Sequence, residues 1–382
     1  MTLLIIDPNF SRTSPSMKGV IAALPRLKSS GLRIEAWACH CDSDLPLDSV
    51  DPLPAWTQIR FFSGLIFSLM VSWRAWWRFT VRGLPRPDII YSIAWYLADC
   101  DVTHVHFSCF DWEKRQQQLG THSLRDRLER ALNLLHLHHS RHALRRTSAR
   151  RVICVSEAVA ADIHAENPAL NLAVLPNCYD PKRFHPEVRD QYRAEMRLRL
   201  GFQEDDQVFI FVSAGHYRRK GFFLAIQTLE KLRQHFENVR FLVIGGSAER
   251  LNKLQNELGS PRNWITFTGM VPDVERYFAA ADAFLFPSYS EAFALVEVEA
   301  AACGLPLFLT PHHGSEMILE DGINGRSIPF DPTDAAEVIS EFLEGRWQMS
   351  HRSLKRAVDQ ETYATEFTNL ILSVPKLSLP TQ

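Results

Sequence analysis

The sequence lacks the features that would place it in a membrane or in an oxidising compartment. Its seven cysteines are odd in number and scattered along 382 residues, which does not make a disulfide framework. The longest apolar stretch, 61–73, is too short and too interrupted to span a bilayer. The first residues do not combine a basic start with a long apolar core, as a signal peptide would. From these absences we expect a cytoplasmic protein.

The chain also lacks a large excess of charge, because its formal net charge is only −2. Basic residues nevertheless gather locally. Residues 112–151 hold ten lysines and arginines against three acids, and the stretch from Arg60 to Arg86 holds five arginines and no acid. Such clusters attract phosphates, nucleic acid or an anionic membrane surface. No nucleic-acid-binding motif accompanies them, so we expect no nucleic acid partner.

Short apolar runs alternate with helical patterns along the whole chain, which predicts parallel sheets in an α/β fold. The expected strands lie at residues 3–6, 34–38, 89–92, 102–106 and 152–155, and then at 208–213, 240–244, 265–268, 283–287 and 306–310. This pattern predicts two doubly wound domains, with a boundary near residues 181–186, where prolines precede a polar helix. Two such domains facing one another would create a deep cleft, because parallel sheets bind ligands beyond the carboxyl ends of their strands.

The most informative segment begins at Phe286 and reads F-P-S-Y-S-E-A-F-A-L-V-E-V-E-A-A-A-C-G-L-P-L. A strand should end at Pro287 and a helix should begin near Ala294, so that Glu291 lies in the loop and Glu299 within the helix. Free amides at the start of that helix could hold a diphosphate. The two carboxylates could accept hydrogen bonds from a sugar and from a ribose. For two glutamates alone, an ordinary loop acid and a surface helix residue would be the simpler interpretation.

The whole segment resembles the Glu-x7-Glu signature of retaining glycosyltransferase family 4, E-G-F-G-L-x-x-x-E-A-M-A-C-G-x-P-V. Glu291 and Glu299 match both acids. The surrounding matches are Phe293, Leu295, Ala300, Ala302, Cys303, Gly304 and Pro306, whereas alanine replaces glycine at Ala292 and Ala294. The resemblance implies a GT-B fold and a nucleotide-sugar donor. It places the donor against Ala292, Phe293, Ala294, Leu295, Val296 and Glu299.

A basic loop, H-Y-R-R-K-G at residues 216–221, follows an expected strand and opens a helix. Three consecutive basic residues alone would indicate a solvated surface loop. The loop is similar, however, to the donor loop of the same family, in which an arginine and a lysine pair with the pyrophosphate. Lys220 fits best and Arg219 is its expected partner, as in bacterial lipopolysaccharide core glucosyltransferases, with Arg218 as a rival. Gly215 and Met270 complete the expected donor contacts.

In the first half of the chain, D-V-T-H-V-H at residues 101–106 resembles a strand end of the family. Alternation along a strand puts His104 and His106 on one face, and His106 is expected to line the acceptor side. A structural histidine is the alternative. The family's Gly-Gly pair after the first strand is missing, because the loop contains Ser14 and Pro15 instead. We assign no acceptor residue in that loop.

No metal or other cofactor is expected. His136, His138, His139 and His142 have a spacing that would permit a metal, but no carboxylate or cysteine accompanies them and the flanking arginines would repel a cation. We interpret the histidines as a polar helix face. Residues 284–287 contain no Asp-x-Asp motif, and the family that the chain resembles needs no metal.

The predicted architecture is GT-B, two Rossmann-like doubly wound domains facing a central cleft. An acceptor-side domain comprises residues 1–186, with a helix at about 361–382 packing back on it, and residues 187–360 form the nucleotide-sugar-binding domain. The resemblance implies transfer, with retention, from a UDP- or GDP-sugar to a saccharide or lipid-linked acceptor in bacterial cell-surface polysaccharide biosynthesis. A sugar-nucleotide epimerase, or a degenerate protein serving as a non-catalytic subunit or membrane adaptor, is the alternative.

The stretch from Phe61 to Arg86 predicts docking on an anionic membrane surface. On a helical wheel, one face collects Phe62, Leu65, Ile66, Leu69, Met70, Trp73, Trp76, Trp77 and Leu84, and Arg74, Arg78 and Arg82 lie on its flank. A peripheral position on the inner face of the cytoplasmic membrane would follow. The alternative is an ordinary core helix, since Phe67, Val71 and Phe79 interrupt the polar side.

Overall fold

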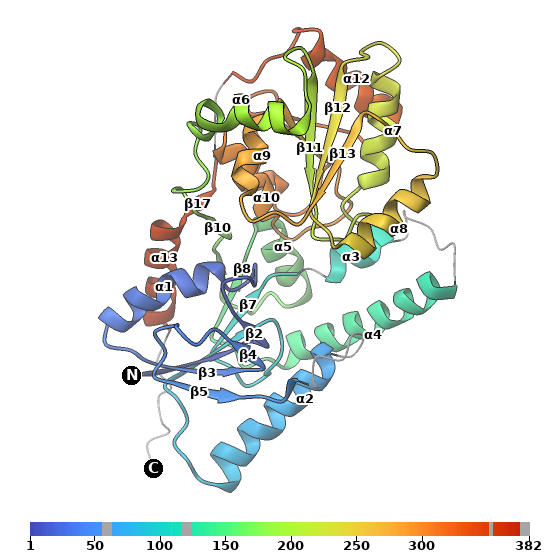
Figure 1. The fold of residues 1–382 in the computed structure, drawn as a ribbon. Helices are drawn as coiled ribbons and strands as arrows, with labels where there is room; N and C mark the ends of the chain where they lie inside the picture. The colour runs from blue at the N-terminus through green and yellow to red at the C-terminus, as the bar shows by residue number, and fades with distance from the viewer. Residues whose placement is uncertain (56–62, 108, 117–123, 351–353, 375–382) are drawn as a thin grey trace. The chain divides into compact units, whose positions relative to one another are not determined.

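The computed structural model describes residues 1–55, 63–107, 109–116, 124–350 and 354–374 (Figure 1). The chain forms two compact units. The first comprises residues 1–178 and the segment from Val358 onward, and the second comprises residues 179–357. The second unit thus begins a few residues before the boundary expected at 186/187, and each unit has its own parallel sheet.

The sheet of the first unit has seven parallel strands in the order β5-β3-β1-β6-β7-β8-β9. Their bounds are β1 Thr2–Ile6, β3 Arg33–Ala38, β5 Ser49–Pro52, β6 Ile89–Ile93, β7 Val102–Val105, β8 Arg151–Cys154 and β9 Leu172–Val174. After β1 the chain winds outward through β3 to β5, and then returns to pair β6 with the other side of β1. This reversal creates a topological switch point at the carboxyl ends of β1 and β6, where doubly wound sheets bind ligands.

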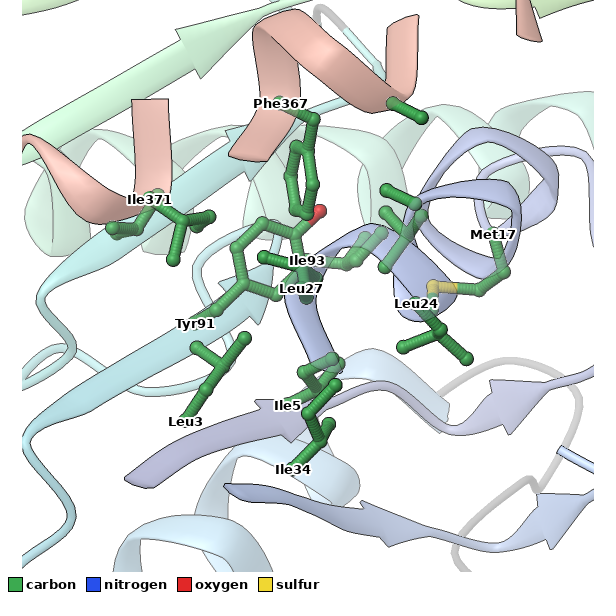
Figure 2. Close-up of a cluster of buried hydrophobic side chains, with 14 of the residues drawn as sticks. Leu3, Ile5, Met17, Leu24, Leu27, Ile34, Tyr91, Ile93, Phe367 and Ile371 are labelled. Atoms are coloured by element: carbon green, nitrogen blue, oxygen red, sulfur yellow. The ribbon is translucent and has the colours of Figure 1, made fainter. Parts of the chain in front are cut away.

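Both faces of this sheet are covered. Successive side chains of β1 point to opposite faces, and they pack in two different cores. Leu3 and Ile5 belong to a core beneath helix α1 (Lys18–Ser29) and helix α13 (Gln360–Leu372), as Figure 2 shows. Leu4 and Ile6 pack on the opposite side with helix α2 (Ser63–Ala75). The remaining helical elements of the unit are η2 Trp76–Val81, α3 Cys109–Gln116, α4 Leu124–Arg146 and α5 Glu157–Glu166.

Helices α1 and α13 come from opposite ends of the chain and pack closely. A Cβ atom on Gly19 of α1 would lie 2.6 Å from ring atoms of Tyr363 in α13. Only glycine therefore allows this approach. Phe367 and Ile371 of α13 complete the same core (Figure 2). The C-terminal helix is thus part of the first unit.

The sheet of the second unit has six parallel strands in the order β13-β12-β11-β14-β15-β16. Their bounds are β11 Gln207–Val212, β12 Val239–Ile244, β13 Ile265–Gly269, β14 Ala283–Phe286, β15 Leu307–Leu309 and β16 Gly325–Ser327. After β13 the chain returns to the other side of β11 and adds β14 there. The switch point of this sheet therefore lies at the carboxyl ends of β11 and β14. The order is that of a dinucleotide-binding Rossmann sheet.

Buried aromatic side chains fill the second core, among them Phe209, Phe211, Phe241, Phe284 and Phe286. Such continuous apolar runs suit parallel strands that helices cover on both faces. The helices are α6 Val188–Leu200, α7 Phe222–Leu232, α8 Ala248–Leu258, α9 Val274–Ala280, α10 Leu295–Ala302, α11 Ser315–Ile318 and α12 Pro332–Leu343. The short strands β2 Asn9–Phe10, β4 His40–Cys41, β10 Cys178–Tyr179 and β17 Val358–Asp359 complete the described elements. The predicted α/β class with two doubly wound sheets is confirmed.

Candidate functional site

Two loops meet at the switch point of the second unit. One follows β11 and carries the basic residues 218–220, and the other follows β14 and carries Glu291. They touch at Gly221, which has φ +76° and at which a Cβ atom would lie 1.8 Å from the carbonyl oxygen of Pro287. The amide of Tyr289 also donates to the carbonyl of Arg219 over 2.9 Å. These backbone contacts hold the two loops in register.

Three charged side chains converge where these loops touch, and we call them the donor cluster: Arg219, Lys220 and Glu291. The Nζ atom of Lys220 lies 3.2 Å from Oε1 of Glu291, and a guanidinium nitrogen of Arg219 lies 3.4 Å from the same oxygen. The Ser288 hydroxyl donates to this carboxylate over 3.2 Å. The lysine ammonium also lies 4.7 Å from the centre of the Phe286 ring, at the end of β14.

The donor cluster is largely enclosed, since the Lys220 side chain is 13% exposed and that of Glu291 is 10% exposed. Burial alone would raise the pKa of Glu291, but the charges of Lys220 and Arg219 outweigh it and lower the pKa to about 2. The carboxylate is therefore ionised at neutral pH. The pKa of His216 is lowered by burial and by the positive charges of Arg219, Lys220 and Arg250. The cluster thus carries a net positive charge.

The three consecutive basic residues separate in space. Arg219 points into the cluster and also donates to the carbonyl of Ser290 over 2.5 Å. The guanidinium of Arg218 instead pairs with Glu257 of α8 over 3.0 Å and lies 5.1 Å from the centre of the Phe223 ring. The structure therefore brings Arg219 and Lys220 to Glu291 and leaves the rival, Arg218, on the surface.

Helix α10 begins beside the donor cluster. Ala294 precedes it in an extended conformation, with φ −87° and ψ 110°, and provides no side-chain cap. An alanine adopts this backbone without strain, so the replacement of the usual glycine does not disturb the loop. Ala292, Phe293 and Ala294 are buried, whereas Leu295 and Val296 are half-buried. The positive end of the α10 dipole is available to an anion.

A buried ion pair lies within the same unit and was not expected from the sequence. Nε2 of His312, after β15, lies 2.6 Å from Oε1 of Glu297 in α10, and both side chains are fully buried. Burial lowers the pKa of His312, but the charge and the hydrogen bond of Glu297 outweigh it and raise the pKa. The charge of His312 also contributes to the lowered pKa of Glu291. Of the pair, His312 thus acts electrostatically on Glu291, whereas burial raises the pKa of Glu297.

The remaining expected donor residues belong to the same unit. Glu299 is buried in α10, and its charge acts on Arg183, whose pKa is raised chiefly by a hydrogen bond to Glu275. Met270 is exposed directly after β13. Gly215 has φ +122°, and a Cβ atom there would lie 2.3 Å from a guanidinium nitrogen of Arg250.

Arg250 is a third residue of this unit that was not expected from the sequence. It belongs to the first turns of α8, and its Nη1 atom donates to the carbonyl of Ala214 over 2.7 Å. That carbonyl lies in the loop after β11. The guanidinium therefore adds a cation to the wall of the site from an element far away in the sequence.

The first unit has a pocket of about 360 Å³ at its own switch point. Its polar and aromatic wall is formed by Asp7, Asn9, Ser14, Ser16, Trp95, Tyr96, His106, Phe107, His139 and Ser140. Ala94 lies beside them with φ +52°, a strained value for a residue with a Cβ atom. Burial raises the pKa of Asp7 to about 7, although the amide of Asn9 donates to its carboxylate over 2.7 Å. Asp7 was not expected from the sequence.

The predicted alternation of His104 and His106 is observed, with ring centres 4.0 Å apart. His104 is fully enclosed, and the hydroxyl of Tyr91 lies 2.7 Å from its Nδ1 atom. Burial lowers the pKa of His106 to about 3, so its ring is neutral. The Nε2 atom of His106 is buried and has no hydrogen-bond partner within the described residues. Of the four clustered histidines, His139 lines the pocket, and the side chain of His136 lies outside the described part.

Comparison with known proteins shows what the chain resembles. Residues 193–361, which include the donor cluster, match the family described as glycosyl transferases group 1. D-inositol 3-phosphate glycosyltransferase from Xylanimonas cellulosilytica is 30% identical over 217 residues, which are 50% of this chain and 50% of that protein. The chain spans no more than about half the length of curated relatives that it matches.

Two solved structures share the fold along nearly the whole chain. WaaG, a glycosyltransferase involved in lipopolysaccharide biosynthesis, superimposes with a TM-score of 0.71 at 20% identity, covering 97% of this chain and all (100%) of that one. HepE from Anabaena in complex with UDP-glucose gives a TM-score of 0.68 at 17% identity, covering 98% and 100%. The chain therefore has the GT-B fold. Within that fold, residues 193–361 match the glycosyl transferase group 1 family.

Proposed function

We propose that the protein is a retaining glycosyltransferase of family 4 that transfers a sugar from UDP- or GDP-sugar to a saccharide or lipid-linked acceptor. The observation that carries the proposal is the donor cluster, in which two cations and one ionised carboxylate converge beside the uncapped start of α10. The roles of the individual residues are predictions. A role in bacterial cell-surface polysaccharide biosynthesis, on the inner face of the cytoplasmic membrane, agrees with the likeness to WaaG.

The donor diphosphate would bind to Arg219, Lys220 and the amides that begin α10. Charge-assisted contacts of this kind are strong, and they are stronger in an enclosed site than in water. Glu291 would then accept hydrogen bonds from hydroxyls of the donor sugar, and Glu299 from the ribose. Gly215 and Met270, at the ends of β11 and β13, would contact the nucleotide.

In the reaction, the bond between the anomeric carbon and the diphosphate oxygen breaks, and its electron pair leaves with the nucleoside diphosphate. Lys220 and Arg219 would stabilise the negative charge that develops on this oxygen, which is the largest catalytic contribution expected of such a site. The acceptor hydroxyl oxygen forms the new bond to the anomeric carbon and releases its proton. The resemblance to family 4 supports retention of the anomeric configuration.

The proposal includes catalysis without a metal ion or another cofactor. Metal-dependent transferases neutralise the diphosphate with a divalent cation, whereas here Arg219 and Lys220 can supply that positive charge. The presence of all three residues of the donor cluster also argues against the two alternatives, a sugar-nucleotide epimerase and a degenerate adaptor. An adaptor would have no need of two cations that converge on one buried carboxylate.

Nucleotide-dependent protection against heat tests the proposal. UDP or GDP at a hundred times its dissociation constant should stabilise the wild type by about 2.7 kcal/mol. Lys220→Ala should lose most of this shift. Arg262→Ala is the matched control, because it breaks an ion pair with Glu230, 2.7 Å long, outside the cluster. Protection of neither protein by any nucleoside diphosphate would support the adaptor and reject the transferase.

A further inference from the structure

Helix α2 and the π-helical turn η2 have two apolar faces. Phe67 and Val71 are fully buried against the first sheet. The opposite face carries an exposed row that we call the α2 stripe: Leu65, Leu69, Trp73, Trp76 and Trp77. Leu69 and Trp73 are 64% and 61% exposed, and the rings of Trp73 and Trp77 stack with centres 6.2 Å apart. The helix is therefore packed on the core by one face, and the stripe lies on its exposed face.

This arrangement corrects part of the helical wheel drawn from the sequence. Phe67, Val71 and Phe79, which interrupt the polar side of the helical wheel, are the residues that anchor the helix to the core. Met70 packs against that core as well and leaves the predicted face. Phe62 lies outside the described residues. One side of the helix thus packs in the core, as the alternative interpretation predicts, and the opposite side is exposed.

The flanking arginines also differ from expectation. Arg74 pairs with Asp51 through Nε over 3.2 Å, and Arg78 lies 3.4 Å from a carboxylate oxygen of Glu35. Both guanidinium groups lie over the ring of Trp37, at 5.6 and 5.8 Å from its centre. They are structural and contribute no uncompensated charge.

Arg82 alone of these three arginines is exposed, directly after η2. The sequence between Asp51 and Asp88 contains no acid, so no acidic residue of this segment opposes its charge. The stripe is therefore followed in the chain by one exposed cation, which would favour an anionic surface.

The same helix forms a wall of the pocket in the first unit. Gly64 and Ser68 line it, together with Asp7, and each of the two precedes a stripe residue in the sequence. At 100° per residue, the pocket wall and the stripe are neighbouring strips of one helix surface. A water-soluble acceptor would need only the pocket. An acceptor with a polar head group and an apolar anchor would use both.

We propose that the first unit binds a lipid-borne acceptor at an anionic membrane surface, with the α2 stripe in the headgroup region and the hydroxylated head group in the pocket. This inference rests on the proposed function and names its acceptor class. Asp7, Ser14 and the unpaired Nε2 of His106 offer the hydrogen bonds that a hydroxylated head group needs. Tryptophan side chains suit the membrane–water boundary. None of the helices in the described part of the chain could traverse a bilayer, so the protein would lie on the surface.

Vesicle co-sedimentation tests the surface. Vesicles of phosphatidylcholine alone are compared with vesicles of phosphatidylcholine mixed with phosphatidylglycerol. The wild type should bind the anionic vesicles, and Leu69→Asp/Trp73→Asp should bind them at least about tenfold more weakly. Leu198→Asp is the matched control, because Leu198 is 84% exposed on α6 of the other unit. Absence of wild-type binding, or equal binding of the double variant, would overturn the proposal.

A transfer assay tests the acceptor class. Labelled nucleotide sugars are supplied with vesicles of a bacterial total-lipid extract, and the label is followed into the organic phase. Ser68→Trp, which fills the pocket, and the stripe double variant should each lose at least about tenfold of the lipid-phase product. Unfolding temperatures, and nucleotide protection in the second unit, show that each variant is folded.

The outcomes separate this proposal from the proposed function. Label only in water-soluble product, with nucleotide protection intact, would overturn the lipid-borne acceptor and leave the transferase. Failure of every nucleotide to protect would reject the transferase itself. Conversion of a dimer to a monomer by the stripe variant, without a change in vesicle binding, would assign the stripe to contact between copies and also overturn the proposal.

Discussion

The Nζ atom of Lys220 lies 3.2 Å from Oε1 of Glu291, although the two residues follow different strands of the second sheet. The ammonium that would bind a diphosphate is thus also engaged by a carboxylate. A bound diphosphate would have to share Lys220 and Arg219 with Glu291. We therefore expect the carboxylate to weaken binding of the leaving group while it positions the sugar. This competition leads to predictions that separate binding from turnover.

Glu291→Gln is expected to lower turnover by at least about a hundredfold, the effect of losing one positioned polar group. Binding of the nucleoside diphosphate should not weaken, and it should tighten as the carboxylate charge is removed. Steady-state rates and isothermal titration calorimetry measure the two effects. A parallel loss of both turnover and nucleoside diphosphate affinity would contradict the competition.

The lowered pKa of Glu291 leads to a prediction for the pH dependence of turnover. Its pKa falls from an ordinary 4.5 to about 2, so Glu291 should remain ionised throughout the neutral range. Its contribution to stability is complete above about pH 4.5 and is lost as the pH falls toward 2. A pH–rate profile of Glu291→Gln should therefore keep the inflections of the wild type between pH 5 and 9.

Arg219 and Arg218 should differ in their effect on turnover, because only the first reaches Glu291. We expect Arg219→Ala to reduce turnover at least about tenfold more than Arg218→Ala. The guanidinium of Arg218 pairs with Glu257 on the surface, whereas that of Arg219 pairs with Glu291. Each alanine variant is the control for the other, since both remove one arginine from the same loop. Equal losses would return Arg218 to the donor site.

Asp7→Asn is expected to stabilise the protein at alkaline pH. Burial raises the pKa of Asp7 from 3.8 to about 7, so the folded state prefers the neutral acid. The free energy of unfolding that this preference contributes falls as the pH rises from about 4 to about 7. The loss is about 4 kcal/mol, and the contribution is constant at higher pH. The variant, neutral at every pH, should unfold at a higher temperature than the wild type at pH 8, with a smaller gap at pH 5.

Asp44→Asn is the control for that comparison. Asp44 lies in the same unit, but its hydrogen bond to Arg12 lowers its pKa, so its removal should not stabilise the protein at pH 8. A gap between wild type and Asp7→Asn that does not change with pH would show that Asp7 does not titrate in this range.

Turnover is expected to survive an excess of chelator. Arg219 and Lys220 can neutralise the diphosphate, and residues 284–287 offer no Asp-x-Asp pair to a divalent ion. Rates measured with ethylenediaminetetraacetate, and then after addition of magnesium or manganese, check this expectation. Loss of activity on chelation, with recovery on adding either metal, would contradict it.

The central strands could be predicted from the sequence, whereas several edge strands could not. β1, β11 and β12 are continuous apolar runs, because both faces of each are buried. β5 and β16 lie at the ends of their sheets and read S-V-D-P and G-R-S. A strand at the edge of a sheet can form with few apolar side chains, so amino-acid composition does not predict these two strands.

The candidate site divides in the same way. Lys220 and Glu291 could be found because each lies in a contiguous segment that resembles a family motif. Arg250 and the pair of Glu297 and His312 act through contacts between distant segments, which no local pattern encodes. Asp7 gave one weak signal, as the first charged residue beyond the carboxyl end of β1. The strand order that makes this position a switch point appears only in the folded sheet.

The most direct test of the account is a panel of nucleotide sugars supplied to the wild type and to Lys220→Ala, with release of the nucleoside diphosphate as the signal. The account predicts release from one UDP- or GDP-sugar by the wild type, and at least about a hundredfold less by the variant. No release from any donor, or equal release by both proteins, would contradict the claim that the donor cluster performs glycosyl transfer.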